Sequence, residues 1–385
     1  MAQHAYLSAS SAYRWLVCPP LVSVEANSGI QERYSPYAAE GTEAHTLGEL
    51  KLRQFLGEDV TGQINTFKGT AEFYDDEMDK HTDTYVDRVI EEFNQHPGAQ
   101  LELEVKVDFS HWVPKGFGTS DAVIISDGLV EVIDLKYGKG VPVSAYQNPQ
   151  LMLYALGAFA RYDFIYDFEQ VKMTIIQPRL DNFSTFTLDV PELLYWADNY
   201  VAPRAAEAYE GRGEWTIDKD VMRFSKVRGN LRPRAQLNFK LIDDYIETEP
   251  ALLGNSEIGK ILERSDEIES WLKDVQAYAL NQILQKGEKV DGYKVVEGRS
   301  NRKIKDEEAF AERLKEEGYA DEQIFKPRSL ETITNLTKLT GKKGFEKLSE
   351  GYVYRPAGKP KLVKENDKRP AIGSVESARE DFSDD

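Results

Sequence analysis

The sequence predicts a protein that combines helices and strands, an α/β (α+β) fold, in which short strands and helices follow one another. Three observations carry this prediction. Residues 101–109 alternate apolar and charged side chains, as a half-buried strand does. Residues 118–136 hold two apolar runs separated by Asp127-Gly128, the dipeptide of a tight hairpin turn. Residues 148–162 form an unusually apolar stretch, which we interpret as a helix packed on a sheet.

Further elements are expected on both sides of this central stretch. A polar loop is expected between Pro20 and Ala38. Helices are expected at Ser8–Leu16, Ala38–Gly57, Tyr74–Gln95, Pro191–Tyr209 and Ser256–Lys286. Two more strands are expected at Val171–Gln177 and Phe183–Leu188.

Composition and charge narrow the classes of protein. The chain has 385 residues, of which 41% are hydrophobic and 30% charged, enough for a real core in two or three domains. No apolar run reaches the roughly 18 residues of a membrane span, and the first residues lack the layout of a secretion signal. The single cysteine, Cys18, excludes an intramolecular disulfide. We therefore expect a cytoplasmic protein with no membrane partner.

The formal net charge of −18 argues against a basic coat for nucleic acid. It leaves room for an enzyme that concentrates positive charge in a local groove.

Two carboxylates and a lysine mark the candidate catalytic site. Asp121 opens the first strand of the hairpin, and Asp134 and Lys136 project from one face at the end of the second. Antiparallel pairing across the turn would bring Asp121 nearly opposite Asp134. Carboxylate oxygens hold Mg²⁺ or Mn²⁺, and a nearby lysine can orient water or offset charge, so the group suits phosphodiester hydrolysis. The alternative is a surface ion pair at a strand end.

Two further side chains are candidates for the same site. His45 shares a helical face with Glu49 and is either a metal ligand or a packing histidine. Glu104 is expected on one strand face with Glu102, Lys106 and Asp108, a face that is either solvated or turned toward the site. In the second case Glu104 would reach a metal directly or through water.

Candidate nucleic-acid contacts lie further along the chain. Lys139 lies in a glycine-containing loop suited to a phosphate, and Gln150 and Tyr154 share a face at the start of the apolar helix. The densest basic run is either a strand-binding surface or a solvated face. Its members are Arg223, Lys226, Arg228, Arg232 and Arg234.

Four short motifs occur in an order that resembles a known family. They are G-T-x-x-H at 41–45, G-T-S-D at 118–121, I-D-L-K at 133–136 and Q-x-x-x-Y at 150–154. Together they resemble the RecB/AddB-type nucleases of the PD-(D/E)XK superfamily. The chain is also similar, over nearly its full length, to phage and prophage proteins grouped as a domain of unknown function.

The resemblance implies a restriction-endonuclease-like core with a mixed central sheet flanked by helices. It implies that His45, Asp121 and Asp134 bind Mg²⁺ or Mn²⁺, that Lys136 is catalytic, and that Gln150 and Tyr154 contact DNA or organise the site. It further implies a place in phage recombination or replication in the host cytoplasm, beside a single-strand-binding or annealing protein. The Q-x-x-x-Y feature favours an exonuclease over an endonuclease.

One departure from the family concerns an iron–sulfur cluster. Relatives often hold such a cluster with one early and three late cysteines. Here Cys18 stands at the early position, but Met222, Ser225 and Leu231 stand where the late cysteines are expected. Because a cluster needs several thiolates, we predict none in this chain.

We accordingly expect three parts. Residues 1–236 would form the nuclease core with its N-terminal helices. Residues 237–370 would form a mainly helical extension, a candidate nucleic-acid contact. Residues 371–385 would form an acidic disordered tail. The main expectation is a metal-dependent deoxyribonuclease. The alternative is a catalytically impaired nucleic-acid-binding scaffold, and homo-oligomerisation is left open.

Overall fold

The computed structural model describes residues 5–30, 35–243, 253–296 and 333–349, with a few single positions between 308 and 316. The chain divides into two compact units, Met1–Val296 and Glu297–Asp385, and each is described by itself. The boundary expected at residue 236 falls inside helix α10 (Arg232–Asp243) of the first unit. The tail expected at 371–385 lies outside the described residues.

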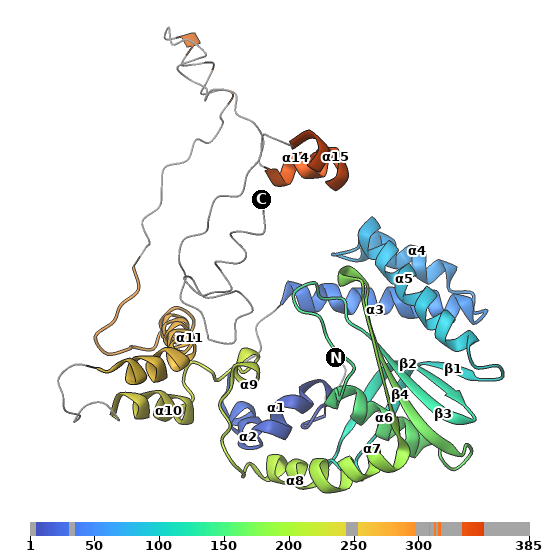
Figure 1. The fold of residues 1–385 in the computed structure, drawn as a ribbon, viewed down its shortest axis with the longest axis horizontal. Helices are drawn as coiled ribbons and strands as arrows, with labels where there is room; N and C mark the ends of the chain where they lie inside the picture. The colour runs from blue at the N-terminus through green and yellow to red at the C-terminus, as the bar shows by residue number, and fades with distance from the viewer. Residues whose placement is uncertain are drawn as a thin grey trace, which may run out of the picture. The chain divides into compact units, whose positions relative to one another are not determined.

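A five-stranded mixed sheet forms the centre of the first unit (Figure 1). Its strands are β1 (Gln100–Asp108), β2 (Phe117–Ser126), β3 (Gly128–Leu135), β4 (Phe168–Gln177) and β5 (Asn182–Asp189). They lie in sequence order, and β3 and β4 alone among these neighbours run parallel. The predicted hairpin is confirmed, because Ser126 pairs with Leu129 and Gly128 takes a φ of 78° in the turn.

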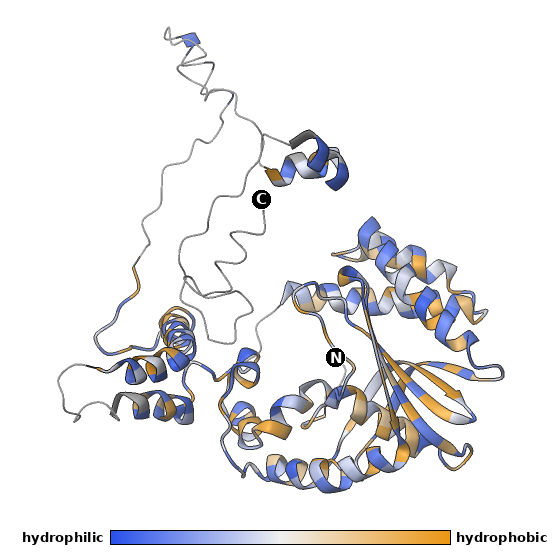
Figure 2. Cartoon of the chain, viewed as in Figure 1, coloured by the Kyte–Doolittle hydropathy of each residue, from blue (hydrophilic) through white to orange (hydrophobic). Residues whose placement is uncertain are grey.

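Helices cover both faces of this sheet, as expected for a mixed α+β protein (Figure 1). On one face α6 (Pro149–Tyr162) connects the parallel strands β3 and β4 and packs in a large core with α7 (Val190–Trp196). On the other face α3 (Pro36–Phe55) and α5 (Asp76–Asn94) pack in a second core, with α4 (Thr61–Thr70) beside them. The strands carry many of the hydrophobic residues between these layers (Figure 2).

The N-terminal region departs from the sequence prediction at one helix. A 3₁₀ turn (Ala9–Ser11) and α1 (Ala12–Val17) occupy the first predicted helix. The expected polar loop is partly wrong, because α2 (Pro20–Asn27) follows at once. Proline is well suited to the first position of a helix, where its missing N–H costs nothing, so the same prolines that end α1 begin α2.

The predicted helix at Pro191–Tyr209 has the expected extent but an irregular centre. It is built from α7, a π-helical turn (Ala197–Val201) and α8 (Ala202–Glu210). Ala197 and Val201 of this turn are buried.

The last part of the first unit is helical. It contains α9 (Lys219–Arg223), α10 and α11 (Asn255–Lys286), and α11 confirms the predicted long helix almost to the residue. In the second unit the described residues include α14 (Ile333–Thr340) and α15 (Lys342–Ser349), which meet at Gly341, with a φ of 70°. Within the described ranges, no helix is long and apolar enough to cross a membrane.

Candidate active site

The β2–β3 hairpin brings Asp121 and Asp134 together, as its sequence predicts. Ala122 pairs with Ile133, so the next position on each strand is one of the two aspartates. The backbone pairing of β2 with β3 ends at Ala122 and Ile133. Beyond it the Asp121 side chain bonds the β3 backbone: its Oδ2 accepts a hydrogen bond of 2.7 Å from the N–H of Leu135. A carboxylate held by the backbone in this way keeps a fixed position at the strand end.

Asp134 and Lys136 form an ion pair on the face of the sheet that α6 covers. Nζ of Lys136 lies 2.9 Å from Oδ2 of Asp134, and 4% of the Asp134 side chain is exposed. Burial raises the pKa of Asp134 above its ordinary value, against the opposing effect of Lys136. Burial disfavours the charge on Lys136, but Asp134 outweighs this and raises the pKa of the amine.

Gln150 joins this pair to α6. Its Oε1 accepts a hydrogen bond of 3.0 Å from Nζ of Lys136, and its Nε2 donates to Oδ1 of Asp134 at 3.0 Å and to the Tyr154 hydroxyl at 3.3 Å. The amide therefore orients both charged groups at once. Of the two roles that the motif implied for Gln150, this geometry favours organising the site.

The start of α6 is fixed by its own sequence. Asn148 is the N-cap, and its Oδ1 accepts hydrogen bonds from the N–H groups of Gln150 and Leu151. Pro149 takes the first helical position. The cap places Gln150 in the first turn and Tyr154 one turn later, which explains the spacing of the Q-x-x-x-Y motif.

The glycine of the G-T-S-D motif also has a packing reason. A Cβ added at Gly118 would lie 2.6 Å from Cε1 of the Tyr154 ring, closer than side-chain atoms approach. A side chain at position 118 would therefore push Tyr154 away from Gln150.

We expect Gly118→Ala to lower the free energy of unfolding by about 1–3 kcal/mol, because the added methyl overpacks against Tyr154. In a double-mutant cycle with Tyr154→Ala, the Gly118→Ala penalty should largely disappear, since the obstructing ring is gone. Chemical denaturation measures all four proteins, and strictly additive effects would contradict this contact.

His45 comes to the site from α3. Its Nδ1 lies 3.2 Å from Oδ1 of Asp121, and its side chain is partly exposed. Burial opposes the positive charge, but the Asp121 carboxylate outweighs it and raises the pKa of His45 to about 9. The imidazole is therefore protonated at neutral pH in this arrangement, and a metal ion would have to displace that proton to be bound.

Glu104 reaches the site because the β1 backbone is irregular there. Glu104 has a φ of 49°, in the left-handed region that non-glycine residues seldom adopt, and it lacks a ladder partner opposite Asp121. Burial, then Asp121 and Glu49, raise the pKa of Glu104 to about 7. The expectation that Glu102 and Glu104 share a face is wrong: Glu102 instead accepts a hydrogen bond from Tyr162 on α6.

This irregularity exchanges the two faces of β1. Before Glu104, Leu101 and Leu103 pack in the core that contains α3 and α5. After it, Val105 and Val107 pack in the core that contains α6. Regular alternation, on which the sequence prediction relied, does not anticipate such a change. Strained backbone of this kind concentrates at functional sites.

The carboxylates and the imidazole of this site are suitable ligands for a divalent cation, but their present distances from one another are not those of a metal site. Three carboxylates and an imidazole are ligand types that Mg²⁺ or Mn²⁺ accepts, and Oδ2 of Asp134 is buried without a hydrogen bond of good geometry. As the side chains stand, however, no three His, Cys, Asp or Glu residues in the described part of the chain are grouped to hold a metal ion. In this arrangement the positive charges of His45 and Lys136 form ion pairs with Asp121 and Asp134 and so neutralise them.

Lys139 lies in the glycine-containing loop that follows β3. Lys139 is exposed. The loop is held by Gln177 at the end of β4: its Nε2 donates to the carbonyl oxygens of Gly138 (2.6 Å) and Val141 (3.0 Å), and its Oε1 accepts from the N–H of Val143 (3.0 Å). A buried glutamine at a strand end was the available signal for this role.

The predicted basic residues of the later segment lie apart from this network. Arg223 and Arg232 are exposed, while Arg228 pairs with Asp274 of α11 at 2.8 Å. Arg234 is buried between Glu267 and Asp274, both 2.7 Å away. Part of the basic run therefore joins α10 to α11. The nucleic-acid role of Arg223, Arg228 and Arg232 stays a prediction.

The residues that replace the expected cluster cysteines do meet Cys18. Cys18, Met222 and Leu231 belong to one small hydrophobic core, and Ser225 is buried as well. Burial raises the pKa of the Cys18 thiol, so it stays protonated. One neutral thiol among apolar side chains does not fit an iron–sulfur cluster, which is bound by thiolates.

The chain belongs to the family described as "Protein of unknown function (DUF2800)", whose model matches residues 4–370. This agrees with the similarity to a domain of unknown function seen in the sequence. Among solved structures, one titled "Crystal structure of SSO0001" is similar at 14% identity, over 60% of this chain and 88% of that chain, with a TM-score of 0.27.

Proposed function

We propose that this protein is a metal-dependent DNA nuclease of the PD-(D/E)XK type, and that it acts as an exonuclease. The observation that carries the proposal is the convergence of Asp121, Asp134 and Lys136 at the end of β2 and β3. The Gln150 hydrogen bonds orient this group from α6. A surface ion pair, the alternative reading, would not need a nearly buried aspartate tied to a helix by a glutamine.

Each residue has a role in this proposal. His45, Asp121 and Asp134 would hold Mg²⁺ or Mn²⁺, which when bound polarises the scissile phosphate and lowers the pKa of a bound water. Lys136 keeps its proton, because Asp134 raises its pKa, and offsets negative charge at the phosphate. Gln150 holds the amine of Lys136 in place, and Tyr154 supports Gln150.

Glu104 adds a titrating group beside the aspartates. With a pKa raised to about 7, its carboxyl exchanges a proton near neutral pH. A carboxyl with this pKa can accept a proton from water at neutral pH, which is the chemistry of a general base. The mixed sheet, with α6 between its parallel strands, supports the superfamily assignment. The order of the four motifs supports it as well.

A second candidate function is a nucleic-acid-binding scaffold without turnover, working beside a single-strand-binding or annealing protein. It is favoured by the apolar core at Cys18, where the family often has a cluster, and by the present spacing of the metal ligands. Phage recombination or replication remains the proposed setting for either function.

The test is cleavage of end-labelled linear DNA and of covalently closed circular DNA with Mg²⁺, Mn²⁺ or EDTA. The Lys136→Ala variant serves as the matched control. Metal-dependent loss of the linear substrate alone, absent in the variant, is the expected result. Nicking of the circle would replace exonuclease with endonuclease. Equal cleavage by the variant would remove this site from the proposal, and binding without cleavage would favour the scaffold.

A further inference from the structure

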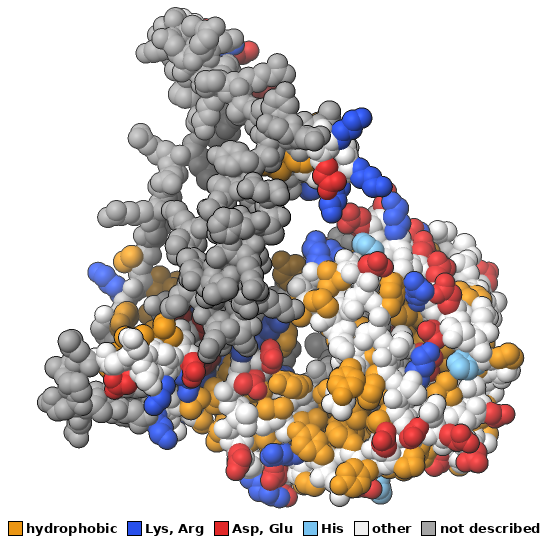
Figure 3. All heavy atoms as spheres, viewed as in Figure 1, with side chains coloured by type: hydrophobic (Ala, Val, Ile, Leu, Met, Phe, Trp, Pro, Cys, Tyr) orange, Lys and Arg blue, Asp and Glu red, His pale blue; other side chains and the backbone are white. Residues whose placement is uncertain are grey.

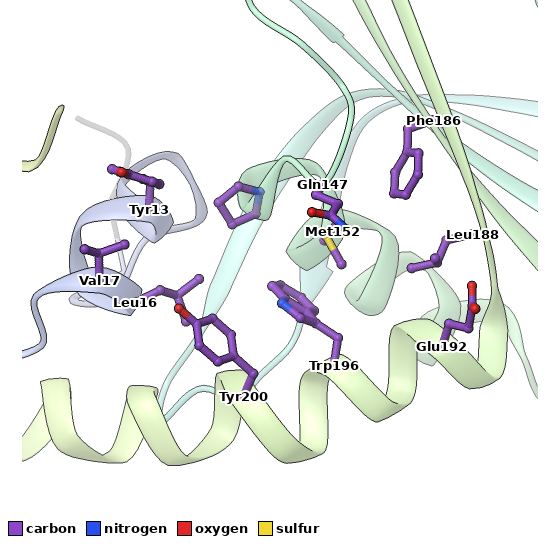
Figure 4. A pocket seen from close by; sticks show the side chains of 11 residues that line it. Tyr13, Leu16, Val17, Gln147, Met152, Phe186, Leu188, Glu192, Trp196 and Tyr200 are labelled. Atoms are coloured by element: carbon purple, nitrogen blue, oxygen red, sulfur yellow. The ribbon is translucent and has the colours of Figure 1, made fainter. Parts of the chain in front are cut away.

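A cavity of about 360 Å³ has α6 in its wall, the helix that also carries Gln150, and four of its lining side chains are aromatic. Figure 4 shows Tyr13 of α1, Phe186 of β5, Trp196 of α7 and Tyr200 of the π-helical turn around it. Aliphatic side chains of α1, α6 and β5 complete the walls. The volume lies within the roughly 300–1,000 Å³ of small-ligand sites.

The aromatic surface continues outside the cavity. The Tyr13 and Tyr200 residues are 43% and 41% exposed. Tyr146, which is 65% exposed, packs edge-on against Phe186 with ring centroids 5.0 Å apart. Hydrophobic side chains gather on the face of the first unit shown in Figure 3, over the region where Figure 1 places α6 and α7. A ligand with a flat apolar face can therefore enter from solvent.

The polar groups of the cavity are few and of particular kinds. Gln147 supplies an amide and Glu192 a carboxylate, and no Lys or Arg is among the described residues that line it. A carboxylate accepts hydrogen bonds from an exocyclic amino group, and an amide can both donate and accept. This set suits the edge of a heterocyclic base, and it offers no cation to a phosphate.

Two walls of the cavity have unusual backbone. Tyr200 stands in the π-helical turn, a feature that often marks functional sites. Gln147 has a φ of 49°, a strained conformation for a residue with a side chain. Both irregularities place side chains at the same cavity.

Helix α6 connects this cavity to the catalytic candidates. Pro149 and Met152 line the cavity. Gln150 and Tyr154, from the same two turns, belong to the Asp134 and Lys136 network. One side of α6 therefore lines the cavity, and another side of the same two turns holds the polar network.

We propose that this cavity binds one unpaired nucleobase of a single DNA strand, stacked on Tyr200 and Trp196 with its amino edge toward Glu192. The inference rests on the proposed function and names its substrate as single-stranded DNA or an unwound end. The contact is stacking, which every base can make because every base has a flat π-face, and it needs no cation in the cavity. The Glu192 carboxylate favours cytosine over thymine, which lacks the amino donor.

The test is equilibrium binding of the full chain to fluorescein-labelled oligo-dC, oligo-dT and a duplex, in EDTA. Anisotropy reports affinity, and quenching of Trp196 fluorescence reports stacking. We expect oligo-dC to bind most tightly, and Tyr200→Ala to weaken it between about fivefold and a hundredfold, the range for losing one stacking ring. Tyr195→Ala, a 70% exposed tyrosine outside the cavity lining, is the matched control and should change nothing.

Two further variants test the stacking contact and the base preference separately. Trp196→Phe should abolish the quenching while retaining most of the affinity. Glu192→Gln should reduce the preference for oligo-dC over oligo-dT. Equal affinities for wild type and Tyr200→Ala, or tighter binding of the duplex, would overturn the proposal. Since these measurements use EDTA, stacking without any cleavage in the nuclease assay would remove the nuclease alone, and cleavage without stacking would remove this inference alone.

Discussion

Replacing Asp134 with asparagine is expected to lower the rate of DNA cleavage at least about a hundredfold, the effect of losing one preorganised charged group in an active site. The free energy of unfolding should fall by about 1–3 kcal/mol. Asparagine keeps the hydrogen-bonding shape but leaves the Lys136 amine without its nearest counter-charge. This loss of stability is smaller than the loss expected when one partner of a fully buried ion pair is removed, because 28% of the Lys136 side chain is exposed.

The double variant Asp134→Asn with Lys136→Met separates the two effects. It removes both charges, so no unpaired ion remains, and its free energy of unfolding should return to within about 1 kcal/mol of wild type. The rate of cleavage should stay as low as in the single variant. Chemical denaturation and the end-labelled DNA assay measure the two quantities. Restored cleavage in the double variant, or an unfolding free energy below that of the single variant, would contradict this account.

Replacing Arg234 with methionine is expected to lower the free energy of unfolding by about 3–5 kcal/mol. The guanidinium is 1% exposed and bonds to Glu267 with two nitrogens, at 2.7 and 3.1 Å, and to Asp274 at 2.7 Å. Methionine fills the space but leaves the two carboxylates of α11 without their common cation. Limited proteolysis should then cut α10 and α11 sooner than the sheet.

The matched control is Arg232→Met on the same helix. Arg232 is exposed, so this change should leave stability unaltered. If the basic run contacts DNA, Arg232→Met should weaken binding in low salt instead. Neutralising both acids with Arg234→Met, as Glu267→Gln and Asp274→Asn, should recover most of the lost stability. An Arg234→Met protein as stable as wild type would show that α10 and α11 are held by their apolar contacts.

The positions of the main catalytic candidates could be predicted from local sequence. Asp127-Gly128 fixes a two-residue turn, and a two-residue turn fixes the register that brings Asp121 opposite Asp134. Strand periodicity places Lys136 on the same face as Asp134. Gln150 and Tyr154 share a helix face because they are four residues apart. Each of these steps spans few residues and depends on backbone geometry alone.

The residues that contact these candidates from distant parts of the chain could not be predicted from local sequence. The contact of His45 with Asp121 depends on where α3 packs, and the anchoring of the Lys139 loop by Gln177 spans about 40 positions. The left-handed residue Glu104 broke the strand alternation on which its predicted face depended. Arg234 belongs to a basic run that was expected to be either a strand-binding surface or a solvated face. It is instead an internal counter-ion, because α11 brings two acids to it.

The sequence by itself determined the α+β class, the hairpin and the pairing of Asp121 with Asp134, since turn chemistry and periodicity act between near neighbours. The tertiary structure alone decided which charges neutralise one another, that Cys18 meets Met222 and Leu231 in an apolar core, and that four aromatic rings surround one cavity. Burial and long-range packing set these features, because both depend on elements that are distant in the chain and adjacent only after folding.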